Sequence, residues 1–139
     1  MARPAKKGID FFPFDVDFLN NIKVRRILRY CGPNSRSILI YLLSNIYKDE
    51  GYYMKWNDDI SFLITDSLGV SEEEINAVIE KSLEVGFFNE KMFEKYKIIT
   101  SKGIQDRYLF ATEKRVKTHV IDEYILVSDT ETRVTDTET

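Results

Sequence analysis

The sequence predicts a mainly α-helical domain with a small β-sheet, and three observations support this fold class. Apolar residues recur at spacings of three and four in most of the first 118 positions, as they do in amphipathic helices. Glycines and capping residues separate these stretches at short intervals. Two short segments, 52–56 and 98–100, are instead rich in aromatic or β-branched residues, which favours strands.

Residues 56–88 contain two helix patterns joined by a three-residue turn. The first helix has one apolar stripe, formed by Ile60, Leu63, Ile64 and Leu68. Gly69 stands where a helix end favours a left-handed residue, and Ser71 with Glu74 forms a capping box that begins the second helix. The inner face of the second helix is formed by Ile75, Val78, Ile79, Ser82, Leu83 and Gly86. This spacing is typical of a helix-turn-helix motif.

A strand is predicted directly after this motif, which favours its winged form. Gly86 ends the second helix, and Phe87 and Phe88 begin the strand. The exposed side of the second helix is acidic and holds one cation: Glu72, Glu73, Asn76, Ala77, Glu80, Glu84 and Lys81. Glutamates near a helix N-terminus stabilise the helix dipole, but they repel the phosphates beside the major groove. The usual reading of DNA by this helix is therefore not expected.

The chain begins with a basic arm and an aromatic lead-in. Three cations of the arm, residues 2–8, are either a phosphate-seeking group or a solvated chain end: Arg3, Lys6 and Lys7. Four phenylalanines surround Pro13 and predict an extended, packed segment: Phe11, Phe12, Phe14 and Phe18. Asp15 and Asp17 are not expected to bind a metal ion, because no further acidic ligand is near and Asp17 suits a helix N-cap.

Two helices are predicted next. The first spans 18–30, and its buried side is formed by Phe18, Ile22, Ile27 and Leu28. Its remaining surface carries the densest basic cluster of the folded part, formed by Arg25, Arg26 and Arg29. Gly32 and Pro33 end this helix. The second helix, 34–48, is apolar all round at its centre and should be the buried central helix.

Short strands and a last helix complete the predicted fold. The segment 52–56 alternates, with Tyr53 turned away from the face formed by Tyr52, Met54 and Trp56. A helical turn at 89–97 leads to a strand at 98–100, and this connection forms the predicted wing. The inner face of the last helix, 101–117, is formed by Ile104, Tyr108 and Ala111. Its C-terminal half holds three cations that also suit the negative end of a helix: Lys114, Arg115 and Lys117.

Composition and charge predict one domain followed by a linker. The 139 residues are 43% hydrophobic, which is enough for one core. Residues 1–120 hold 19 Lys and Arg against 17 Asp and Glu, whereas residues 121–139 hold one Arg against six acids. The tail repeats VSDTET as VTDTET, so we expect a disordered linker to a further C-terminal region. Residues 121–127 either form another strand or lie on the domain.

The residues predict neither an enzyme nor a metal or cofactor site. Cys31 and His119 are the only cysteine and histidine and fall in different elements, and there is no glycine-rich phosphate loop and no zinc-ligand spacing. The start of the chain lacks a signal peptide, and no apolar run approaches the roughly 20 residues of a membrane span. We therefore expect a soluble, cytoplasmic protein that has neither a small-molecule substrate nor a membrane partner.

Four stretches resemble one domain family: DFFPFDVDF, GYYMKW, LGVSEEEI and GFFNEKMFEKYKIITSKGIQDRYLFATEKR. Its members are described as domains of unknown function or as phage replisome organiser N-terminal domains, and are similar to the N-terminal winged-helix domain of DnaD-type replication proteins. The resemblance covers residues 8–118. It implies a winged helix, a replication or mobile-element context, DNA contact and self-association, with much of the DNA affinity in the C-terminal region.

Two functions follow as hypotheses. The first is a non-enzymatic, DNA-associated domain of a phage or mobile-element replication protein, with weak phosphate contacts from Arg25, Arg26, Arg29, Lys114, Arg115 and Lys117. The alternative is a module that binds itself or a replication protein and does not touch DNA. Its candidate surfaces are Tyr52 or Tyr53, the edge of the sheet, and the lead-in from Phe11 to Phe14.

Overall fold

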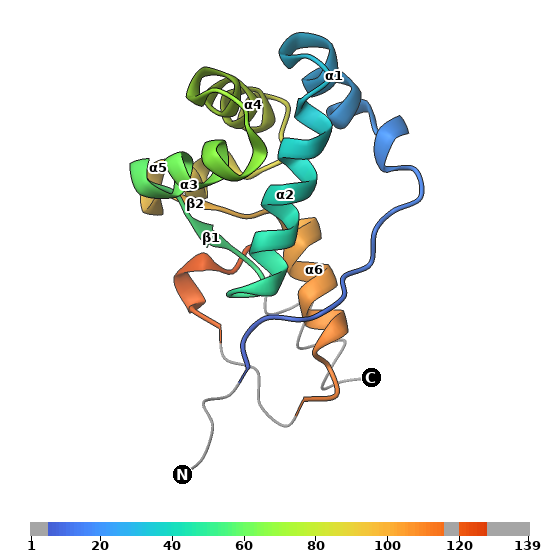
Figure 1. The fold of residues 1–139 in the computed structure, drawn as a ribbon. Coiled ribbons are helices and arrows are strands. Elements are labelled where there is room, and N and C mark those ends of the chain that lie inside the picture. The colour runs from blue at the N-terminus through green and yellow to red at the C-terminus, as the bar shows by residue number, and fades with distance from the viewer. Residues whose placement is uncertain (1–5, 116–119, 128–139) are drawn as a thin grey trace.

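The computed structural model describes residues 6–115 and 120–127 (Figure 1). Two antiparallel strands pair with Met54 opposite Ile99, and the remaining elements are helical. In chain order the elements are η1 (Phe18–Asn20), α1 (Ile22–Cys31), α2 (Ser35–Lys48), β1 (Met54–Lys55), α3 (Asp58–Leu68), α4 (Glu72–Glu84), α5 (Glu90–Tyr96), β2 (Ile98–Ile99), α6 (Lys102–Ala111) and η2 (Asp122–Tyr124). The predicted class, mainly helical with a small sheet, is confirmed.

Helix α2 is the buried centre of the fold, as predicted. In Figure 1 it runs past α1 and α4 at one end and past α6 at the other. Its inner positions are fully buried: Ile38, Leu39, Leu42 and Ile46. The apolar surface around the centre of α2 is nevertheless not buried on all sides, because Ile40 is 40% exposed.

Helices α3 and α4 are joined by the tight turn predicted between them. Gly69 adopts a left-handed φ of 70°, and both halves of the Ser71–Glu74 capping box are present. The predicted stripe of α3 is wrong at Leu63, which is 59% exposed. The buried face of α3 is instead formed by Ser61, Ile64 and Thr65. Two of these residues are small and polar, so the spacing of the large apolar residues did not predict this face.

The strand predicted at Phe87 and Phe88 is not formed. Both backbone N–H groups donate to the carbonyl oxygen of Ser82, at 2.8 and 3.1 Å, and this turn ends α4. Asn89 then caps α5 by accepting a hydrogen bond from the Met92 N–H. The connection between α4 and β2 is therefore helical, and the described part of the chain has no third strand to complete the predicted wing.

Three predicted faces are also corrected. Ile22 is 62% exposed, because α1 begins only at Ile22 and buries Val24 and Ile27. Phe11 of the lead-in is 89% exposed. Ala111 is exposed because α6 ends there.

The alternation predicted at 52–56 is wrong, because Tyr52, Tyr53 and Met54 are buried one after the other. This burial raises the pKa of Tyr53 to about 12.

Residues 120–127 lie on the domain as a strap and do not form a strand. The buried Gln105 side chain donates to the Tyr124 carbonyl at 2.8 Å and accepts from the Leu126 N–H at 2.6 Å. The Ile121 N–H donates to the Tyr52 hydroxyl at 2.8 Å. Of the two alternatives left open for residues 121–127, the structure therefore has the second, and the acidic repeat from 128 onwards lies outside the described residues.

The ring of Tyr108 in α6 packs on the turn that leaves α2. Gly51 in this turn has a φ of 97°, and a Cβ atom there would stand 2.0 Å from the Tyr108 ring. The Tyr108 hydroxyl donates to the Lys7 carbonyl at 2.7 Å. The N-terminal segment, the turn after α2 and helix α6 therefore meet at the Tyr108 side chain.

Gly51→Ala should be far more damaging than Gly69→Ala. Both positions have a positive φ, which costs a residue with a Cβ about 1–2 kcal/mol. Only Gly51 adds a clash, worth a further ~1–3 kcal/mol, since no described atom lies within 4 Å of a Cβ at Gly69. Urea unfolding of both variants measures the difference, and equal losses of free energy would refute this role for the Tyr108 contact.

Gln105→Leu should loosen the strap. It leaves the Tyr124 carbonyl and Leu126 N–H without their partner, which costs about 1–3 kcal/mol for each group that stays buried. Hydrogen exchange at 121–126 should accelerate, whereas the exposed neighbouring change Asp106→Asn should leave it unaltered. Unchanged exchange in the Gln105 variant would mean that another contact holds the strap.

Candidate nucleic-acid interface

The outer face of α1 carries the basic cluster. Asn21 caps this helix by accepting from the N–H groups of Lys23 and Val24, and the inner residues Val24 and Ile27 are fully buried. Helical spacing therefore places five exposed residues together on the other side: Ile22, Arg25, Arg26, Arg29 and Tyr30. We call this set the α1 outer face.

The three arginines of the α1 outer face are not neutralised within the domain. None of the ion pairs found among the described residues involves Arg25, Arg26 or Arg29. Lys23 on the same helix differs, because its Nζ donates to the Gly86 carbonyl at 3.2 Å, just beyond the C-terminus of α4. The arginines thus retain their charge at the surface, where a guanidinium can pair with a phosphate through two N–H groups.

Helix α4 packs directly against α1 and brings an acidic surface next to the basic one. Cys31 Sγ donates to the Ala77 carbonyl at 3.4 Å, and Asn34 Nδ2 donates to Glu74 Oε2 at 2.8 Å. The Asn34 hydrogen bond is the main reason that the pKa of Glu74 is lowered. The outward glutamates of α4, Glu72, Glu73, Glu80 and Glu84, are exposed. A DNA duplex on α4 would meet these carboxylates first.

Sequence reasoning missed two members of the α1 outer face. Ile22 is 62% exposed and Tyr30 is 72% exposed, and each lies one turn from an arginine. The Lys81 ammonium stands 3.7 Å from the centre of the Tyr30 ring. The regular spacing from 22 to 30 was the signal that could have identified both, once α1 was known to begin at Ile22.

The second predicted cluster is not on a helix. Helix α6 ends at Ala111, where the Thr112 hydroxyl donates to the Tyr108 carbonyl at 2.8 Å. Lys114 is exposed in the following turn, and Lys117 lies outside the described residues. Figure 1 shows this turn at the opposite end of the molecule from α1. The structure therefore does not bring the two predicted clusters together.

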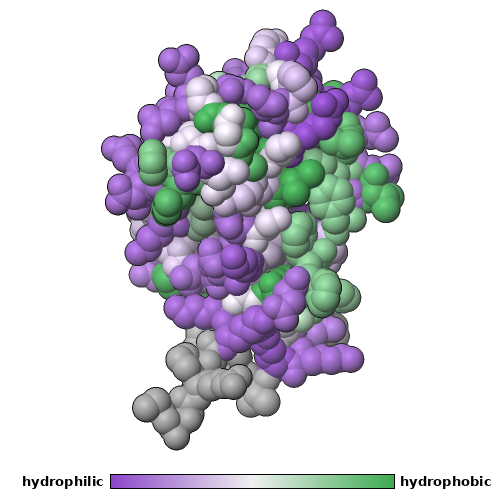
Figure 2. Space-filling model, in the orientation of Figure 1, coloured by the Kyte–Doolittle hydropathy of each residue, from purple (hydrophilic) through white to green (hydrophobic). Residues whose placement is uncertain are grey.

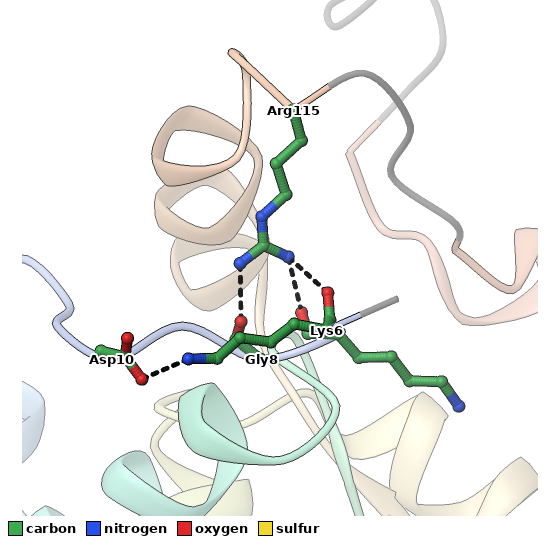
Figure 3. Close-up of polar contacts among 5 residues, drawn as sticks. Lys6, Gly8, Asp10 and Arg115 are labelled. Atoms are coloured by element: carbon green, nitrogen blue, oxygen red, sulfur yellow. Dashed lines mark hydrogen bonds and ion pairs between the residues drawn. The ribbon is translucent and has the colours of Figure 1, made fainter. Parts of the chain in front are cut away.

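Arg115 holds the N-terminal segment in place. Its guanidinium donates to the carbonyl oxygens of Lys6, Lys7 and Gly8, at 2.9, 3.1 and 2.7 Å (Figure 3). Lys6 in turn pairs with Asp10, and Lys7 lies 3.5 Å from a Glu50 carboxylate oxygen. Two of the three arm cations therefore have acidic partners, and Arg3 lies outside the described residues.

Of the predicted protein-binding surfaces, only part is exposed. Tyr52 and Tyr53 are 3% and 4% exposed, so the prediction that they form a surface is wrong. In the lead-in, the Phe12 ring stacks on Tyr47 with 4.5 Å between centroids, whereas Phe11 and Val16 are 89% and 95% exposed. Figure 2 shows hydrophobic side chains along the flank where Figure 1 places the lead-in.

The described residues show no further chemical centre. No group of three or more His, Cys, Asp or Glu side chains within this part of the chain is placed to hold a metal ion. No helix in the same part is long and apolar enough to cross a membrane.

Comparison with known proteins places the chain in a family. A family model described as "Lin1244/Lin1753-like, N-terminal" matches residues 11–104. A protein from Listeria innocua, described as "Uncharacterized phage-related protein Lin1244/Lin1753", is 35% identical over 127 residues, which cover 91% of this chain and 41% of that protein. The chain thus spans less than half the length of this relative.

The descriptions of these matches do not mention replication, which the resemblance led us to expect. No solved structure matches the chain. The family description and the relative's name concern a phage-related protein, so the predicted likeness to replisome organisers and DnaD-type proteins stays a prediction. Because the family model covers most of the chain, this protein belongs to the Lin1244/Lin1753-like N-terminal family.

Proposed function

We propose that this chain is a non-enzymatic, DNA-associated domain of a phage replication protein, in the form of a winged-helix variant. The observation that carries the proposal is the α1 outer face, where three exposed arginines have no carboxylate within ion-pair distance among the described residues. The phage-related description of the Listeria relative supports the biological context. The contact is directed at phosphates and carries little sequence specificity.

The charge distribution favours α1 over α4 as the element that meets DNA. Phosphates attract the arginines of α1, whereas the glutamates along α4 repel them. At physiological salt, charges separated by more than about 8 Å are largely screened. Direct contact with the arginines therefore matters more than the net charge of −3 for the whole chain.

Binding to a random duplex should weaken steeply with salt. Three phosphate contacts give a log–log slope of about −3, so affinity should fall roughly 60-fold between 50 and 200 mM salt. Fluorescence anisotropy of a labelled duplex, titrated with residues 1–139, measures this slope. A flat salt dependence, or no binding at low salt, would refute the phosphate contact.

Charge reversal tests which cluster is used. Arg25→Glu combined with Arg26→Glu and Arg29→Glu should abolish binding at low salt without unfolding the domain, because all three side chains are exposed. Lys114→Glu is the matched control at the other end of the molecule and should weaken binding by a small factor at most. The reverse order of effects would assign the DNA contact to the turn after α6.

The second candidate function is a protein-interaction or self-assembly module that does not bind DNA. The exposed lead-in favours it, since Phe11 and Val16 present apolar side chains at 89% and 95% exposure. Replacing both by serine should reduce self-association measured by analytical ultracentrifugation and leave the unfolding midpoint unchanged. A wild-type chain that stays monomeric at high concentration, with DNA binding intact, would exclude self-assembly through this surface.

A further inference from the structure

A small pocket separates the lead-in from helices α2 and α6. It has a volume of about 70 Å³, and Leu43 and Ile104 lie at its apolar base. Four phenylalanine rings line it: Phe12, Phe14, Phe18 and Phe87. These rings come from the lead-in, from η1 and from the turn after α4. The pocket is therefore a product of tertiary packing, with apolar and polar side chains in its walls.

One buried polar group in the wall of this pocket lacks a hydrogen-bond acceptor. Tyr47 lines the pocket and is 1% exposed, and its hydroxyl finds no acceptor within the described part of the chain. Burial raises the pKa of Tyr47, and the polar contact of its hydroxyl with the Arg107 guanidinium, together with the charge of that group, partly offsets this. The hydroxyl therefore lies close to the Arg107 guanidinium, at the α6 side of the pocket. A buried hydroxyl without an acceptor is destabilising, and a ligand that accepts a hydrogen bond from it would remove that cost.

Arg107 places a second donor group at the same wall. Its Nη1 atom lies 3.2 Å from the position that a Cβ of Gly103 would take, so the side chain folds back over the first turn of α6. None of the ion pairs found in the described ranges involves Arg107. Ser101, the N-cap of α6, lines the pocket too. The Arg107 guanidinium and the N-terminal end of the α6 dipole thus both contribute positive potential at this wall, and no acidic side chain among the described residues pairs with the guanidinium.

We propose that this pocket binds the carboxylate of a small organic acid with a short apolar body. A guanidinium donates two parallel N–H groups to a carboxylate, and the Tyr47 hydroxyl can donate to one of its oxygens. The aromatic walls suit the hydrocarbon part of the acid and disfavour a strongly hydrated dianion. The site is separate from the α1 outer face and does not depend on the proposed DNA contact.

Asp15 is the one acidic residue that lines the pocket, and it provides a sharp test. Its Oδ1 accepts the N–H of Asp17 at 2.9 Å, and the residue is exposed at the rim. It lies beyond ion-pair distance from Arg107, so it does not neutralise the guanidinium. If the ligand is an anion, Asp15→Asn should bind it more tightly, whereas a cationic ligand would be bound more weakly.

Sodium butyrate is the probe, titrated into isotope-labelled protein of residues 1–139 and followed by two-dimensional NMR. Saturable shifts are expected at the amides of Ser101, Gly103 and Ile104 and at the Arg107 Nε–H, with a Kd on the order of millimolar for so small a ligand. Equal concentrations of sodium chloride control for ionic strength. Shifts that do not saturate, or that chloride reproduces, would overturn the proposal.

Variants separate binding from folding. Arg107→Gln should weaken butyrate binding at least tenfold, and Arg26→Gln on the α1 outer face is the control that should not change it. Tyr47→Phe removes a hydroxyl that has no acceptor in the described part of the protein, so it should change the unfolding midpoint little while weakening binding severalfold. Unchanged affinity in both pocket variants would refute the site, and tighter binding of inorganic phosphate than of butyrate would refute the carboxylate assignment.

Discussion

The contact between Tyr108 and Gly51 is the constraint on which the rest of the structure depends. The ring occupies the space that any side chain at Gly51 would need, and Gly51 itself ends α2 by donating its N–H to the Ile46 carbonyl at 2.7 Å. The same ring lies 5.4 Å from that of Tyr52, centroid to centroid, just before β1. The direction in which the chain leaves α2 is thereby tied to α6, and the N-terminal segment joins them through the hydrogen bond of the Tyr108 hydroxyl.

This constraint organises both ends of the chain around α6. Arg115, just after α6, holds the carbonyl groups of the N-terminal segment, and Gln105 within α6 holds the strap. Gly8 packs so closely on the end of α2 that a Cβ there would stand 1.8 Å from the Lys48 carbonyl oxygen. The lead-in that follows runs past α6 and along the flank of the molecule toward α1 (Figure 1), and Phe12 and Phe14 contribute to the walls of the pocket.

The packing of α1 on α4 decides the electrostatics of the candidate interface. It places a basic and an acidic surface side by side without any ion pair between the arginines of α1 and the glutamates of α4 among the described residues. A polyanion would be attracted by the arginines of α1 and repelled by the glutamates of α4. The proposed DNA contact is therefore assigned to α1 and not to α4.

Local hydrogen bonding made much of the fold predictable from sequence. The Gly69 turn, the Ser71–Glu74 capping box and the apolar centre of α2 depend on residues within one or two helical turns, so their sequence spacing was sufficient. The basic row of α1 was identified for the same reason. Its exposed companions, Ile22 and Tyr30, became clear only when η1 was seen to displace the start of the helix.

Only the tertiary structure decided the remaining features, because each depends on groups far apart in the chain. Phe87 and Phe88 turn back on Ser82 where their residue types favoured a strand, and Tyr53 is buried against Tyr124 of the strap, with 4.8 Å between ring centroids. Arg115, predicted as a surface cation, is bound by carbonyl groups more than 100 positions earlier in the chain. The pocket beside Tyr47 has no local motif at all, since its walls come from four separate segments.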